Sequence, residues 1–370
     1  MKNVIITIVC TLFSLTIVQA NHQKKIDSLS NKNYQYFEEK VMEFRTDSVK
    51  AQQFAKYWLK KANEEKNLMQ QAKAYKTLIH FVDKKYRMIY ADSLLEKAKE
   101  TRNNEILGSA YLTIGVAHYD NNEYTKALDL YILANNYIAN TKDQYLIHKV
   151  KYTIAVTKYF LGYYDEAIAL LKQCMDFFRE ENDLAYLRSM HAIGLCYTQI
   201  ERYDHSSYFN KLGMKLASEY EMDDMIPYFK NANGINLCIQ KDYENAIKLL
   251  KESKPHFEKV NDYANLITTK FYLGKCYWGI YDKSKAVTYF LKVHEDIQTK
   301  KYTRPDLREG YEILIQYFSE INELEKELFF IKKLMEFDKE INKEFKYLTY
   351  KVHKEYDTKT LLEKKKKIEN

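Results

Sequence analysis

Apolar residues recur at helical spacing along most of the chain, in segments separated by short polar turns. In one such segment Ala167, Leu170, Leu171 and Cys174 follow the i, i+3, i+4, i+7 pattern, which places them on one face of a helix. A helix with one apolar face is stable only when that face packs against another element. The pattern therefore predicts many amphipathic helices that cover one another.

The helical segments repeat with a period close to 40 residues. Tyr124, Tyr164, Tyr203 and Tyr243 stand in matching positions, 40, 39 and 40 residues apart. Because one helix pair cannot bury its own apolar faces, this repeat predicts stacked pairs that share a continuous core. Two further series keep the same period, a small residue before the tyrosine and an alanine after it. They are Gly115, Ala155, Gly194, Gly234 and Gly274, and Ala127, Ala167, Ala246 and Ala286.

This signature resembles that of tetratricopeptide repeats, in which a small residue lies in the first helix of each pair and an alanine opens the second. The resemblance covers residues 35–340 and is clearest over 108–295. Ser206 replaces one alanine, and Lys283 stands where the fifth tyrosine is expected. The family implies an all-α, right-handed α-solenoid of about six to eight antiparallel helix pairs. A period near 40, against the usual length of about 34 residues, predicts long helices.

Weaker helix pairs flank the clear repeats. Residues 51–62, 69–84 and 91–98 carry helical patterns before them, and 310–320 with 324–337 form a last pair after Pro305. We therefore divide the chain into five parts. These are a signal peptide (1–20), degenerate helical pairs (21–107), five clear repeats (108–300), a degenerate last repeat (301–340) and a charged C-terminal helix or tail (341–370).

Composition narrows the class of protein further. Glycine and proline number nine and three among 370 residues, which excludes collagen-like and Pro/Gly-rich disordered chains and disfavours an all-β sandwich. The net charge of +7 is spread along the chain apart from the lysines near its end. Since nucleic-acid binding needs basic residues clustered on one face, we expect this chain to make no direct contact with nucleic acid.

No catalytic or metal-binding motif stands out. The chain lacks a Gly-rich phosphate loop, a Gly-x-Ser-x-Gly elbow and a His-Glu-x-x-His pair, so we expect no enzymatic activity, cofactor or metal. Four cysteines remain after residue 20. Cys174, Cys196, Cys238 and Cys276 lie inside helical patterns, where they are either buried thiols or, in an oxidising compartment, contribute at least one disulfide.

The first twenty residues have the pattern of a signal peptide. Lys2 precedes an apolar run over 4–18, and Val18 and Ala20 supply the small residues of a cleavage site. We expect export to the periplasm or beyond, with cleavage near Ala20. The alternative is an uncleaved segment that anchors the chain in the inner membrane.

The resemblance also implies a binding surface, because first helices line the concave face of tetratricopeptide solenoids. The positions that we expect to face this groove carry aromatic, basic and amide side chains, a composition typical of peptide-binding surfaces. The alternative is that these aromatic side chains pack against neighbouring helices. The groove candidates are Tyr119, Lys149, Tyr152, Tyr159, Arg188, His191, Tyr228, Asn231, Phe271, Lys275 and Trp278.

The C-terminal stretch carries a second resemblance. The run from Glu355 to Lys365 is similar to the membrane-proximal part of exported tetratricopeptide sensors from Bacteroidetes-type bacteria, which continue into a membrane helix and a helix-turn-helix domain. We therefore expect a sensory or scaffold protein that binds a peptide or protein, with a membrane-associated partner as a further option. Two alternatives remain: the input domain of a truncated or split transcription regulator, and a cytoplasmic peptide-pheromone receptor of the phosphatase-regulator type. The oligomeric state stays open.

Overall fold

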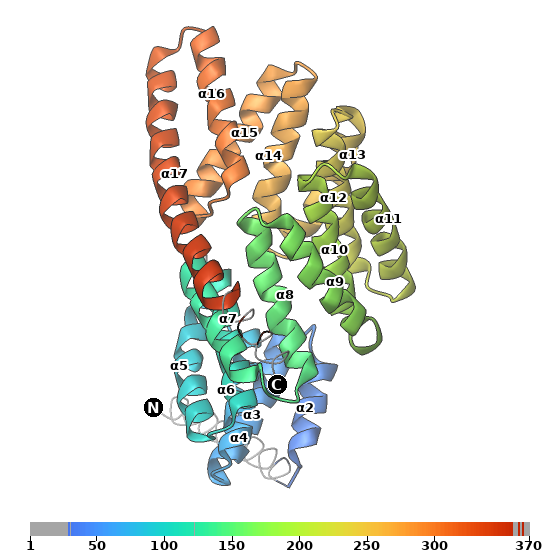
Figure 1. Cartoon of the computed structure of the whole chain (residues 1–370), viewed down its shortest axis with the longest axis vertical. Helices are drawn as coiled ribbons and strands as arrows, with labels where there is room; N and C mark the ends of the chain where they lie inside the picture. The colour runs from blue at the N-terminus through green and yellow to red at the C-terminus, as the bar shows by residue number, and fades with distance from the viewer. Residues whose placement is uncertain (1–28, 30, 122, 358–361, 363–364, 366–370) are drawn as a thin grey trace, which may run out of the picture. The chain divides into compact units, whose positions relative to one another are not determined.

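The computed structural model describes residues 29, 31–121, 123–357, 362 and 365. The expected signal peptide and most of the basic end of the chain lie outside these residues. The described part contains sixteen α-helices and no strand, which confirms the all-α prediction (Figure 1). The helices are α2 (Tyr34–Glu43), α3 (Ser48–Glu64), α4 (Leu68–Phe81), α5 (Lys84–Glu100), α6 (Asn104–Asp120), α7 (Tyr124–Ile138), α8 (Gln144–Phe160), α9 (Tyr164–Glu181), α10 (Asp183–Gln199), α11 (Tyr203–Glu219), α12 (Ile226–Ile239), α13 (Tyr243–Lys259), α14 (Tyr263–Gly279), α15 (Lys283–Lys300), α16 (Arg308–Glu320) and α17 (Leu324–Lys351).

The chain divides into two compact units. The first consists of Met1–His118 with Asn136–Thr141, and the second of Tyr119–Asn135 with Lys142–Asn370. In the first unit α2, α3, α4 and α5 pack in sequence, and Phe37, Trp58 and Leu78 lie in its core. The segment 51–62 thus lies within α3, as its pattern predicts, whereas the segment 69–84 forms α4 only as far as Phe81, because Lys84 already begins α5.

The second unit holds the clear repeats from α8 onward. Helices α8 to α17 pack as consecutive pairs, and the small residue of each first helix is where its partner comes close. A Cβ atom on Gly194, Gly234 or Gly274 would lie 2.8, 2.9 or 2.8 Å from side-chain atoms of Asn210, Leu250 and Phe290 respectively. Each contact joins residues 16 positions apart, so one geometry recurs from pair to pair. The repeat period in the sequence therefore corresponds to the same close contact between the two helices of each pair.

The turn inside each pair explains how the fold forms with so little glycine. Gly162 has a φ of 84°, and Glu201, Lys241, Tyr281 and Asn322 occupy matching positions with φ of 60°, 67°, 63° and 59°. The next residue's N–H donates to a carbonyl in the last helical turn, as from Tyr163 to Lys158, which ends the helix in a Schellman-type cap. A non-glycine residue in this left-handed conformation costs about 1–2 kcal/mol. Packing of the pairs offsets that cost at most of these turns.

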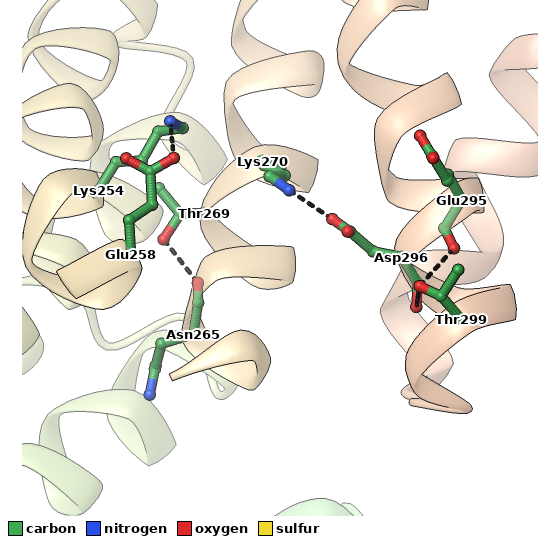
Figure 2. A network of polar contacts seen from close by, with 8 residues as sticks. All are labelled: Lys254, Glu258, Asn265, Thr269, Lys270, Glu295, Asp296 and Thr299. Atoms are coloured by element: carbon green, nitrogen blue, oxygen red, sulfur yellow. Dashed lines mark hydrogen bonds and ion pairs between the residues drawn. The ribbon is translucent and has the colours of Figure 1, made fainter. Parts of the chain in front are cut away.

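Polar contacts add to the apolar packing of the pairs. Lys270 of α14 forms an ion pair of 2.6 Å with Asp296 of α15, and both side chains are largely buried (Figure 2). Asn231 is only 3% exposed, and its side-chain oxygen accepts hydrogen bonds from Thr269 at 2.9 Å and from Ser253 at 3.4 Å. The carboxamide of Asn231 therefore links α12 to α13 and α14.

The C-terminal helix is longer than the pattern over 324–337 predicts. α17 runs without a break across residue 340 to Lys351, and a π-helical turn continues to Asp357. Leu348, Val352 and Tyr356 are buried, so the end of this charged segment carries its own apolar stripe. None of the described helices is both long enough and apolar enough to span a membrane. The cysteines Cys174, Cys196, Cys238 and Cys276 are buried and free.

Candidate ligand-binding groove

The first helices of the pairs form one continuous surface in the second unit. α8, α10, α12, α14 and α16 contact each other in chain order. Side chains from α8 and α14, which have two helix pairs between them, converge on one residue: the hydroxyls of Tyr159 and Thr268 both accept hydrogen bonds from Arg304. The row of first helices therefore curves around this point. We call the surface that it presents the inner face.

The segment Tyr302–Asp306, between α15 and α16, fills part of the inner face. Its Arg304 forms an ion pair of 2.8 Å with Asp306 and donates to the Tyr159 hydroxyl and the Thr268 hydroxyl, each at 3.4 Å. Tyr272 donates to Asp306 at 3.3 Å. We call the five hydrogen-bonded residues Tyr159, Thr268, Tyr272, Arg304 and Asp306 the Arg304 cluster. Because the Arg304 and Asp306 side chains are only 15% and 27% exposed, the cluster acts as a polar bridge across the curve of the solenoid.

Helix α17 also covers part of the inner face. Tyr347 donates a hydrogen bond of 2.7 Å to Asp129 of α7, and Lys351 forms an ion pair of 3.1 Å with the same carboxylate. Farther along, Lys158 of α8 pairs with Asp357 at 2.9 Å although its side chain is only 4% exposed. These contacts join residues about 200 positions apart. α17 therefore ties the last helix of the unit to its first helices.

A small cavity remains between α17, the Tyr302–Asp306 segment and the start of the unit. Its walls include Tyr119, Tyr131, Phe160, Tyr302 and Phe345, and its volume is about 40 Å³. A single water needs about 10–15 Å³ of such space. The cavity thus has room for a few waters, and a peptide cannot enter this part of the inner face without displacing α17 or the segment.

The other part of the inner face is open. Lys149 and Arg188 are exposed at its edge, and Tyr152, His191 and Tyr228 are half-buried beside them. Although the Lys149 side chain is partly exposed, packing around it lowers the pKa of its ammonium, the charge of Arg188 lowers it further, and Asp143 opposes both effects. Arg188 also counteracts the effect of burial on the pKa of Tyr152 and Tyr228. These five residues come from α8, α10 and α12, and we call them the open site.

Charge at the open site is unbalanced. Within the described residues Arg188 forms no hydrogen bond or ion pair, and the Lys149 ammonium lies 5.6 Å from the ring of Tyr145. A nearby carboxylate, Asp262, accepts the hydroxyl of Tyr228 at 3.1 Å and caps the start of α14 through the Asn265 N–H. Two adjacent cations beside aromatic rings form a surface that suits an anionic group with apolar neighbours.

The remaining groove candidates lie elsewhere. Phe271 is fully buried against Phe290, and Asn231 is buried between three helices as described above. Tyr159 belongs to the Arg304 cluster, and Tyr119 lines the small cavity. Lys275 forms an ion pair of 2.7 Å with Glu309, and the half-buried Trp278 lies 5.1 Å from the ammonium of Lys283. Five of the eleven candidates thus form the open site. The other six lie in the core, in the Arg304 cluster, in the wall of the small cavity or in contacts between helices.

The signature residues of the repeat take structural positions. Each of them is buried, and the glycines and Ala155 lie in the first helices of their pairs. These residues are Gly115, Ala155, Gly194, Gly234, Gly274, Ala127, Ala167, Ala246 and Ala286.

Sequence reasoning missed the residues that close the inner face. Tyr302, Arg304 and Asp306 lie outside the helical periodicity, and Tyr159, the partner of Arg304 on α8, is 145 positions away. Their only local signal is a charged segment next to Pro305 at a helix start.

No family model matches the chain, and no curated protein is similar to it in sequence. Among solved structures it is similar to a Rap protein complexed with competence and sporulation factor, with a TM-score of 0.60, 13% identity, and coverage of 86% of this chain and 99% of that chain. It is also similar to aspartyl phosphate phosphatase F from Bacillus subtilis, with a TM-score of 0.55, 19% identity, and coverage of 77% and 75%. A third similar structure is the Rap conjugation gene regulator of plasmid pLS20 in complex with the Phr* peptide, with a TM-score of 0.52, 14% identity, and coverage of 78% and 86%.

These likenesses concern the fold, since the identities are low. Together with the stacked helix pairs they show that the chain has a tetratricopeptide-like, all-α solenoid architecture.

We predict that Arg304→Met lowers the free energy of unfolding by about 3 kcal/mol, because it leaves Asp306 partly buried without its counter-charge. Urea denaturation followed by circular dichroism measures the change. The double variant Arg304→Met with Asp306→Asn should recover part of the loss. As a control, Arg308→Met breaks a more exposed pair with Asp338 and should cost less than about 1 kcal/mol. Equal losses for Arg304→Met and Arg308→Met would contradict the bridging role.

The open site also predicts a pH dependence. Burial lowers the pKa of His191 from 6.5 to about 4, partly opposed by a hydrogen bond to the Tyr228 backbone. Between these two values the unfolded chain binds a proton at this residue that the folded chain does not bind. Stability from His191 is therefore complete above its unfolded pKa and falls as the pH drops toward the folded pKa, by up to about 2 kcal/mol at pH 5.

His191→Gln should remove this component, so the difference between wild type and variant should shrink or change sign from pH 7 to pH 5. Chemical denaturation at a series of pH values measures it, and parallel profiles for the two proteins would show that His191 is not buried in its neutral form.

Proposed function

We propose that the chain is a non-enzymatic binding protein that holds a peptide or protein segment against the open site of its inner face. The observation that carries the proposal is the unpaired charge of Arg188 next to Lys149, among the half-buried side chains of Tyr152, His191 and Tyr228. Two neighbouring cations repel each other in the free protein, although Asp143 offsets part of this effect on Lys149. An anionic ligand group removes that repulsion, so the site favours ligand over water.

The chemistry of the open site favours an acidic segment with apolar or aromatic neighbours. Arg188 offers a planar set of donors for a carboxylate, and the ammonium of Lys149 lies beside it. The rings of Tyr152 and Tyr228 supply amphipathic contact area at low entropic cost. Because the Arg304 cluster and α17 fill the rest of the inner face, the ligand extends along α8, α10 and α12.

We predict that Arg188→Ala combined with Tyr152→Ala weakens ligand binding at least about tenfold, equivalent to about 1.4 kcal/mol. The protein is panned against a random peptide display library, and the selected peptides are measured by calorimetry. Peptides selected by the wild type should be enriched in Asp and Glu. Pull-down and cross-linking from the native host then identify the cellular ligand.

Lys211→Ala is the matched control, because it also removes one positive charge but lies exposed on α11, a second helix. It should leave binding unchanged. Selection of peptides without acidic residues, or equal binding by the double variant and the wild type, would refute the open site as the ligand site.

A sensory role accounts best for a binding solenoid with a resemblance to sensor proteins at its C-terminus. The fold supports a second candidate in the same class of function. Two of the similar Rap structures contain a bound factor or peptide, which supports the cytoplasmic peptide-receptor alternative. Input to a split transcription regulator remains the other alternative. The candidates differ in cellular compartment, which the next experiment determines.

We further propose that the chain is exported and that its mature form begins at Asn21. The support is the charge and apolar pattern of residues 1–20. Expression in a Gram-negative host, followed by fractionation and N-terminal sequencing, should give a periplasmic protein that starts at Asn21. Phe13→Asp, which interrupts the apolar run, should leave a full-length cytosolic protein. Cytosolic wild-type protein with an intact N-terminus would instead favour the cytoplasmic receptor.

A further inference from the structure

Two of the buried cysteines meet across a repeat boundary. Cys238 of α12 and Cys276 of α14 belong to the same core cluster and are 3% and 0% exposed. The Cys238 thiol donates to the backbone carbonyl of Tyr272 at 3.7 Å, one helical turn before Cys276. Cys238 is also the neighbour that most raises the pKa of the Cys276 thiol, which is consistent with close approach of the two side chains. The helices that carry them are in contact although α13 separates them in sequence.

The repeat register explains this meeting. Counted from the small residue of each first helix, Cys238 is four positions after Gly234 and Cys276 is two positions after Gly274. The same offsets from Ala155 and Gly194 give Tyr159 and Cys196, which share another core cluster. Between these two boundaries lies that of α10 with α12, where the same offsets from Gly194 and Gly234 give Thr198 and Asn236. Position +4 of one first helix thus faces position +2 of the next, and only one of these three boundaries carries cysteine at both positions.

We propose that Cys238 and Cys276 form a disulfide that links α12 to α14 when the chain folds in the presence of a disulfide oxidant. The oxidant is an external disulfide, such as oxidised glutathione or the active-site disulfide of a thiol oxidoreductase. One cysteine attacks it as a thiolate and forms a mixed disulfide with release of one oxidant thiol. The second cysteine then displaces the other oxidant sulfur. The protein loses two hydrogens in total, and the oxidant is reduced to two thiols.

Burial of the two cysteines determines when they can be oxidised. Contact with Cys238 and burial both raise the pKa of Cys276, so the thiolate that attacks an oxidant is scarce once the pairs have stacked. Oxidation therefore takes place during folding, before α14 packs on α12, and the native reduced protein reacts slowly. The link does not depend on the ligand or on the open site.

Mass spectrometry tests the link directly. The unfolded, reduced chain is refolded with oxidised glutathione or with a reductant, denatured, alkylated and digested. Refolding with oxidant should give a peptide pair joined through Cys238 and Cys276, about 2 Da lighter than the sum of the free thiol peptides because two hydrogens are lost. Cys174 and Cys196 should be alkylated in both samples, because they lie in separate clusters.

Variants serve as controls. Cys174→Ala with Cys196→Ala should keep the linked peptide, and the oxidised protein should unfold at a higher temperature than the reduced one. Cys276→Ala should abolish both the linked peptide and that difference. Complete alkylation of both Cys238 and Cys276 in the oxidised wild type, or a link between any other pair of cysteines, would overturn the proposal, even if the Cys276 variant fails to fold.

Discussion

The close approach of the two helices at the small residue of each pair is the constraint on which the repeats of the second unit depend. At Gly194, Gly234 and Gly274 an added Cβ atom would lie 2.8–2.9 Å from a side chain of the second helix, each time at an offset of 16 residues. Protein interiors are packed densely enough that a single added carbon is felt. This contact therefore fixes which faces of the first helices turn inward, and with them the inner face, the open site and the meeting of Cys238 with Cys276.

If every helix pair made only the same repeated contacts, the inner face would be open along its whole length. In this chain the Tyr302–Asp306 segment and α17 cover part of it. The Arg304 cluster joins α8 to α14, and α17 returns to α7 and α8 through Asp129 and Lys158. These bridges are polar and partly buried, so their contribution depends on both partners being present. They leave a cavity of about 40 Å³ where a groove would otherwise continue, so the part of the inner face that stays open is the neighbourhood of Arg188.

The sequence predicts those features that recur and fails where a contact is unique. Periodicity located the helices and their pairing from α8 onward, because the same spacing is repeated several times. It also brought Lys149, Tyr152, Arg188, His191 and Tyr228 together. It could not separate Phe271 or Asn231 from them, since the register gives a helix face but not the depth of a side chain. The contact between Tyr159 and Arg304 joins positions 145 residues apart, and no local pattern encodes it.

The open site places two cations, Lys149 and Arg188, close together, an arrangement that the stability of the fold alone does not favour. Elsewhere lysines such as Lys158, Lys270 and Lys275 have carboxylate partners. At the open site, the surrounding packing lowers the pKa of Lys149 and the nearby charge of Arg188 lowers it further. A local conflict that the surrounding fold tolerates is characteristic of functional sites. In the function proposed above, an anionic ligand relieves the repulsion between these cations. Its binding to Arg188 then also stabilises the stacking of α8, α10 and α12.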